Sequence, residues 1–136
     1  MGDDLFHVRD TRDFHLAVEA GEGNDRVTLR NAYASAFQTD GGADNDRIVL
    51  THTTGRDTPL ADPANVLGGT GDDSIVLRNT EASSPAVSGG EGDDAVQVNG
   101  VAADPLRLEA GLGDNSLRLD DITRNTEVII GFRNFD

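Results

Sequence analysis

A 21-residue repeat runs through the chain and constrains its fold more than any other feature. Six segments align on an Asp or Asn anchor: GDDLFHV (2–8), AGEGNDRVTL (20–29), GGADNDRIVL (41–50), GGTGDDSIVL (68–77), GGEGDDAVQV (89–98) and AGLGDNSLRL (110–119). The anchors are Asp4, Asp25, Asp46, Asp73, Asp94 and Asn115, so the successive steps are 21, 21, 27, 21 and 21 residues. The period is therefore 21, with one insertion of six residues in the third unit.

Each unit carries the pattern of two short strands. Two and four residues after each anchor lie apolar residues: Phe6/Val8, Val27/Leu29, Ile48/Leu50, Ile75/Leu77, Val96/Val98 and Leu117/Leu119. A weaker pair in the same phase precedes the glycines: Leu16/Val18, Phe37/Thr39, Ala64/Val66, Pro85/Val87, Leu106/Leu108 and Glu127/Ile129. Alternation with a period of two is typical of half-buried strands.

Units this short cannot bury an apolar face alone, whereas stacked units place identical positions in ladders around a narrow core. We therefore predict an all-β, parallel β-solenoid of about six coils in one domain, residues 1–136. An antiparallel sandwich is the alternative, because its strands also lie about ten residues apart. Residues 51–65 carry the insertion and should form a loop at one corner. The chain begins in the middle of a turn, as a segment of a longer protein would.

Composition narrows the range of partners. The formal net charge is −14, which argues against nucleic acid and against an anionic membrane surface. All 11 basic residues are Arg, and cysteine is absent, which excludes disulfides and thiolate metal sites. No apolar run is long enough to cross a membrane, and MGDDLFHVRD lacks the features of a signal peptide. The charge indicates cations or solvent as partners.

Stacking the repeat also stacks its acids. Asp25 should lie over Asp46 and Asp73 over Asp94, and like charges at the spacing of strands repel one another. A cation between adjacent turns would reverse that effect. Carboxylates and glycine carbonyls are hard oxygen ligands of the kind that Ca²⁺ accepts with flexible geometry, whereas Mg²⁺ demands a stricter octahedron.

Two of the turns, GGTGDDSIV (68–76) and GGEGDDAVQ (89–97), match the nonapeptide G-G-x-G-x-D-x-U-x without a fault. The chain therefore resembles the RTX (repeats-in-toxin) calcium-binding β-roll family of secreted bacterial proteases, lipases, toxins and adhesins. The resemblance implies a right-handed roll that folds when Ca²⁺ fills the stacked turns, and export by a type I system. One departure is that the motif occupies only one edge of each coil, so we expect a single row of at most five sites.

The resemblance also implies the ligands. Carboxylates would come from the aspartate anchors, beginning with Asp4, and main-chain carbonyls would come from the glycines around them. The turns around Asp44, which replaces a glycine, and around Asn115 should bind poorly or stay empty. The implied set is Asp4, Gly21, Gly23, Asp25, Gly42, Asp44, Asp46, Gly69, Gly71, Asp73, Gly90, Gly92, Asp94, Gly111, Gly113 and Asn115.

We therefore expect a structural, calcium-binding module of a secreted or cell-surface bacterial protein. The alternative is a solenoid that binds a polysaccharide or a cell-surface partner, with calcium only as scaffold. An enzyme is not expected, because no Ser, His and Asp form a recognisable arrangement and the three histidines (His7, His15 and His52) occupy unrelated phases of the repeat. A fragment of a polysaccharide-modifying β-helix remains a third hypothesis.

Overall fold

The computed structural model describes residues 2–55, 65–82, 85–103, 105–122 and 127–132, and over these ranges the chain forms strands joined by turns and bends. One sheet has six strands: β1 (Leu5–Arg9), β3 (Arg26–Arg30), β5 (Arg47–Thr51), β8 (Ser74–Arg78), β11 (Ala95–Asn99) and β14 (Ser116–Asp120). The second has nine: β2 (Arg12–Glu22), β4 (Tyr33–Ala43), β6 (Thr54–Gly55), β7 (Asn65–Thr70), β9 (Glu81–Ala82), β10 (Ala86–Glu91), β12 (Ala102–Ala103), β13 (Leu106–Leu112) and β15 (Val128–Phe132). These ranges contain no helix that is long and apolar enough to cross a membrane.

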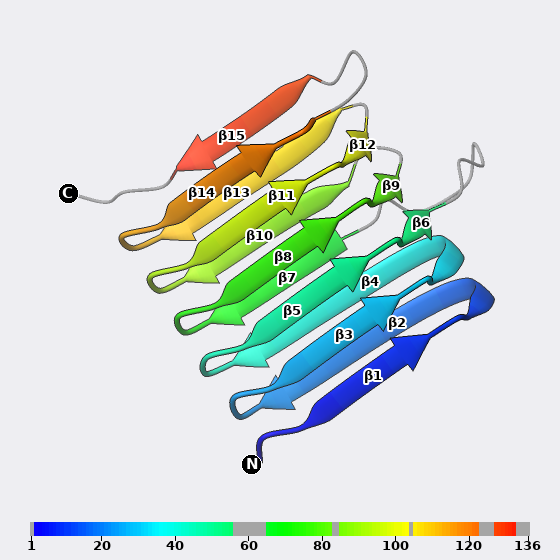
Figure 1. Cartoon of the computed structure of the whole chain (residues 1–136). Helices are drawn as coiled ribbons and strands as arrows, with labels where there is room; N and C mark the ends of the chain where they lie inside the picture. The colour runs from blue at the N-terminus through cyan, green and yellow to red at the C-terminus, as the bar shows by residue number, and fades with distance from the viewer. Residues whose placement is uncertain (1, 56–64, 83–84, 104, 123–126, 133–136) are drawn as a thin grey trace.

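Every strand pairing between the described residues is parallel, and the sequence period is the pairing register. Phe6 pairs with Val27 and Val27 pairs with Ile48, each 21 residues on. Ile48 then pairs with Ile75 across the insertion, and the step returns to 21. The coils stack in chain order from one end of the molecule to the other (Figure 1) and make about five complete turns. The predicted parallel β-solenoid is confirmed, and the antiparallel sandwich is wrong.

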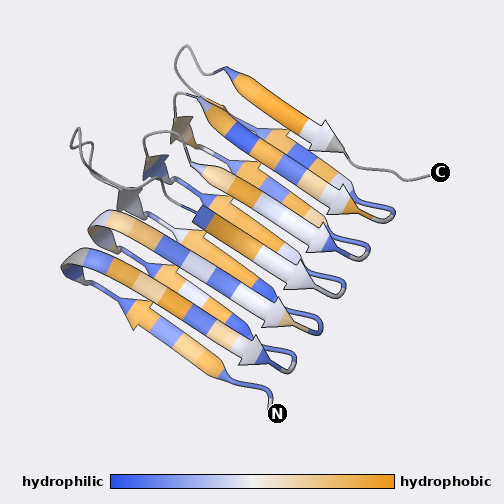
Figure 2. Cartoon of the chain, turned by 180° about the vertical axis from the view of Figure 1, so that it is seen from behind, coloured by the Kyte–Doolittle hydropathy of each residue, from blue (hydrophilic) through white to orange (hydrophobic). Residues whose placement is uncertain are grey.

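The core is a ladder of aliphatic side chains between the two sheets. Inward and outward positions alternate along the strands, as the hydropathy colours of Figure 2 show. The largest fully buried side chains are Phe37, Leu29, Ile48, Leu50, Ile75, Leu77, Leu106, Leu108, Val27, Val66, Val87 and Val98. At the two ends of the first sheet, Phe6, Val8, Leu117 and Leu119 are only partly buried, because they have a core neighbour on one side only.

The pairing places the six extra residues within the course of the second sheet. Ala34 pairs with Gly55 and Gln38 pairs with Asn65, so four steps along β4 correspond to ten steps one coil later. The corner ahead of it keeps the common register, since Tyr33 pairs with Thr54 as the repeat requires. Most of the loop predicted at 51–65, namely residues 56–64, lies outside the described residues.

The last strand departs from the predicted phase. The repeat pairs Leu106 with Glu127, but the structure pairs Leu106 with Val128, and a register irregularity follows between Glu109 and Gly111. This shift turns apolar Val128 toward the core in place of an acid, and the irregularity absorbs the extra residue. The prediction that Ile129 faces inward was therefore wrong: its side chain is 40% exposed.

The corner that leads from the first sheet to the second has a fixed backbone conformation. The sixth residue after each anchor has a φ between 49° and 64°, in the left-handed region. Asn, Asp and Gly tolerate this region better than other residues, which explains their frequency here. The residues are Asp10, Asn31, His52, Asn79, Gly100 and Asp121.

Candidate metal-binding turn edge

The glycine-rich turns lead from the second sheet to the first along one edge of the solenoid, which we call the turn edge (Figure 1). Their glycines allow the coils to approach closely. Gly69 has a φ of 118°, and a Cβ at this position would collide with the carbonyl oxygen of Gly42 in the preceding coil. Asp44 is the exception, because it occupies a third-glycine position at a φ of 77°.

Inside these turns the anchors form one file, which we call the anchor ladder: Asp4, Asp25, Asp46, Asp73, Asp94 and Asn115. From Asp25 onward, Oδ1 of each anchor accepts a hydrogen bond from the main-chain N–H of the anchor one coil earlier, at 2.6 to 2.9 Å. Such a bond to a main-chain amide favours the charged carboxylate and opposes the repulsion along the file. The sequence indicated the repulsion but not this hydrogen bond.

A second file lies outside the first. The residue before each anchor, from Asp3 to Asp93, uses its side-chain Oδ1 to accept a hydrogen bond from the main-chain N–H of its equivalent one coil later, at 2.7 to 3.2 Å. These side chains are exposed, and they join the coils in the direction opposite to the anchor ladder. We call this file the outer ladder: Asp3, Asn24, Asn45, Asp72, Asp93 and Asp114.

The anchor ladder holds buried oxygens that the rest of the described chain does not satisfy. The side chains of Asp25, Asp46, Asp73 and Asp94 are only 2–3% exposed, and Oδ2 of each is buried without a hydrogen-bond partner. Buried polar atoms of this kind are uncommon and costly unless a proton, a water or an ion satisfies them.

The first glycine of the motif makes room for this oxygen. A Cβ on Gly68 would collide with Oδ2 of Asp73 and with the carbonyl oxygen of Gly89 in the next coil. The same relation holds for Gly41 with Asp46 and for Gly89 with Asp94. Sequence reasoning did not include these first glycines among the site residues, although their regular position five residues before the anchor was the signal.

Burial changes the acidity of the ladder. Desolvation raises the pKa of Asp73 to about 7; the hydrogen bond from the Asp46 N–H opposes this change, and the neighbouring carboxylates reinforce it. Desolvation also raises the pKa of Asp46 and of Asp94. A file of carboxyls that resists ionisation needs a proton or a cation nearby.

The predicted ligands divide into two groups. Asp25, Asp46, Asp73 and Asp94 lie together in the buried file, whereas Asp44 is exposed at the surface of its turn. No three Asp, Glu or His side chains of the described residues converge where they could hold one ion. A cation at this edge would therefore need main-chain carbonyls for most of its ligands, which Ca²⁺ accepts.

Comparison with known proteins adds no relative. Neither a protein-family profile nor a curated protein nor a solved structure matches this chain.

Proposed function

We propose that the chain is a structural, non-catalytic β-solenoid module whose turn edge binds calcium. The observation that carries this proposal is the file of four buried carboxylates, each with one oxygen that lacks a partner. These oxygens fit a hard cation, because a positive charge would satisfy them and relieve the burial that raises the pKa of Asp73.

Within this proposal, Oδ2 of Asp25, Asp46, Asp73 and Asp94 and carbonyl oxygens of the neighbouring glycines hold the ions. Oδ1 of each anchor stays on the main-chain amide of the coil before it. Calcium supplies charge and coordination to these groups. Because every coil contributes to the file, the free energy of binding adds directly to the stability of the solenoid.

The resemblance of the turns to RTX repeats extends the proposal to the setting. Calcium outside a bacterial cell is abundant, so a chain exported in an open form would fold there. We therefore propose a secreted or cell-surface protein, exported by a type I system, as the parent of this module.

The test is calcium binding measured by isothermal titration calorimetry on protein stripped with EDTA. We expect Ca²⁺ to bind and to raise the urea midpoint of unfolding, and Mg²⁺ at the same concentration to do much less. A ligand at 100 times its Kd raises the unfolding free energy by about 2.7 kcal/mol. A chain that is equally stable in EDTA and in Ca²⁺, with no heat of binding, would overturn the proposal.

Two double variants localise the site. The D73N/D94N variant removes two charges from the anchor ladder and keeps both Oδ1 acceptors, so it should lose calcium affinity. The D72N/D93N variant makes the same charge change in the same two turns but in the exposed outer ladder. It should bind calcium nearly as well as the unaltered chain. Equal losses in both variants would assign the affinity to net charge alone.

A further inference from the structure

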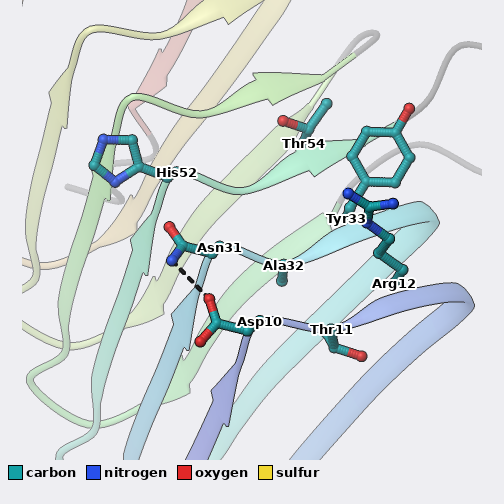
Figure 3. Close-up of a pocket in the computed structure, with 8 residues that line it drawn as sticks. All are labelled: Asp10, Thr11, Arg12, Asn31, Ala32, Tyr33, His52 and Thr54. Carbon is teal, nitrogen blue, oxygen red and sulfur yellow. Dashed lines mark hydrogen bonds between the residues drawn. The ribbon is translucent and has the colours of Figure 1, made fainter.

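The corner edge of the solenoid, opposite the turn edge, carries a hollow of about 390 Å³ over the first three coils (Figure 3). It is built by two short files of the repeat. Asp10, Asn31 and His52 occupy the left-handed corner positions, and Arg12, Tyr33 and Thr54 follow two residues later. Arg12 pairs with Tyr33, and Tyr33 pairs with Thr54, so the three side chains start from adjacent strands.

The chemistry of the hollow is that of a polar binding site. Nδ2 of Asn31 donates a hydrogen bond to Oδ1 of Asp10 at 2.8 Å, which holds the two planar groups together. Arg12 is exposed and makes no hydrogen bond or ion pair with the residues that the structure describes. The half-buried ring of Tyr33 lies beside it, and His52 lies across the hollow (Figure 3).

The solenoid itself does not require these side chains. The file of Arg12, Tyr33 and Thr54 continues in later coils with Glu81 and then Ala102. A coil therefore forms equally well with an acid or a methyl group at this position. The aromatic ring and the cation occur only where the hollow lies, so packing does not explain their presence.

We propose that this hollow binds an acidic saccharide unit, such as a uronic acid within a polysaccharide. The guanidinium of Arg12 would pair with the sugar carboxylate, the geometry that Arg supports best. The ring of Tyr33 would pack against the apolar C–H face of the sugar, as amphipathic aromatic residues do. Asp10, Asn31 and His52 supply the acceptors and donors for hydroxyl groups.

Size and charge agree with this ligand. Ligand pockets measure about 300–1,000 Å³, so the hollow lies at the small end of the range and suits a mono- or disaccharide unit. An acidic ligand would otherwise be repelled by a chain of net charge −14, so a single free cation in a polar hollow is the group that selects it. The proposal goes beyond the calcium site and does not require it, because the two lie at opposite edges (Figure 1).

The test compares cellobiouronic acid with cellobiose, which differ only by a carboxylate in place of a hydroxymethyl group. Both are titrated into the full chain at constant saturating Ca²⁺, with the fold checked by circular dichroism. We expect the acid to bind at least ten times more tightly than the neutral sugar. On the unaltered chain, NMR shift changes should be confined to residues 10–12, 31–33 and 52–54.

Variants assign the contacts. R12Q should lower the affinity for the acid at least tenfold and remove the preference over cellobiose, whereas Y33A should weaken both sugars. The matched control is E81Q, which alters the same file outside the hollow and should change neither affinity. The proposal is overturned by equal affinities for the two sugars, by shift changes elsewhere on the chain, or by inorganic sulfate binding as tightly as the acid.

Discussion

Replacing Asp73 with Asn should stabilise the metal-free chain and weaken its response to calcium. The substitution is nearly isosteric, and the repeat already contains the product at the same phase. Oδ1 of Asn115 accepts the N–H of Asp94 at 2.7 Å, as Oδ1 of Asp73 accepts the N–H of Asp46 at 2.8 Å. Asp73→Asn therefore keeps the hydrogen bond between coils and removes only the buried charge.

The sign follows from the pKa of Asp73, which burial raises from 3.8 to about 7. Between these values the folded chain holds a proton that the unfolded chain has released. The stability of metal-free protein is therefore highest below pH 4 as far as this group is concerned, and it falls as the pH rises to about 7. Each pH unit costs about 1.4 kcal/mol, which amounts to about 4 kcal/mol over the full interval.

Solvent at the turn edge screens part of this cost, so we expect Asp73→Asn to raise the unfolding free energy in EDTA at pH 8 by about 1–2 kcal/mol. At pH 5 the unaltered Asp73 is already protonated, and the gain should nearly vanish. In saturating Ca²⁺ at pH 8 the order should reverse, because the variant lacks a ligand.

The assay is urea unfolding followed by far-UV circular dichroism at both pH values, with EDTA or with Ca²⁺. The matched control is Asp93→Asn, an exposed carboxylate in an adjacent coil whose Oδ1 accepts the N–H of Asp114 at 2.8 Å. This control should show neither the gain in EDTA nor the reversal. If Asp73→Asn lowers stability by the same amount with and without calcium, the carboxylate has only a packing role and the reasoning fails.

Three further substitutions test the other parts of the coil, each by urea unfolding. Gly68→Ala should lower the unfolding free energy by about 1–3 kcal/mol, because the new methyl group collides with Oδ2 of Asp73 and a main-chain carbonyl; a neutral result would show that the carboxyl moves freely. Leu77→Ala should cost about 2–5 kcal/mol, since Leu77 is fully buried between two other coils; a cost below about 1 kcal/mol would mean that the ladder repacks. Asn79→Ala should cost about 1–2 kcal/mol and Asn79→Gly much less, because φ is 49° at this corner; equal effects would locate the loss in the side chain instead of the backbone.

The fold could be predicted from the sequence because its period in the chain equals its period in space. A constant step of 21 residues brings Val27, Ile48 and Ile75 into one ladder without any knowledge of loop geometry. The prediction was wrong where that step changes. Val128 replaces Glu127 as the partner of Leu106, because burial of an apolar side chain outweighs the register of the repeat.

The candidate site could be predicted only in part. The motif identified the anchors, and the structure places Asp46, Asp73 and Asp94 in one buried file. Sequence alone could not show that each Oδ1 binds an amide of the preceding coil, because that bond depends on which way a side chain turns inside the coil. It also gave no reason to connect Arg12 with Tyr33 and His52, which lie 21 and 40 positions further along the chain.

These two edges differ in a way that bears on where a repeat protein carries recognition. A residue that recurs in every coil must satisfy the same contacts in every coil, and the anchor and outer ladders do so through hydrogen bonds that repeat along the solenoid. A residue that occurs once, such as Tyr33, is free of that requirement, and its neighbours in the file show that the coil tolerates other side chains there. Selection for a ligand can therefore act on the corner edge without disturbing the turn edge. For this reason we expect substitutions in the hollow to change binding while leaving stability intact, and substitutions in the anchor ladder to change stability first.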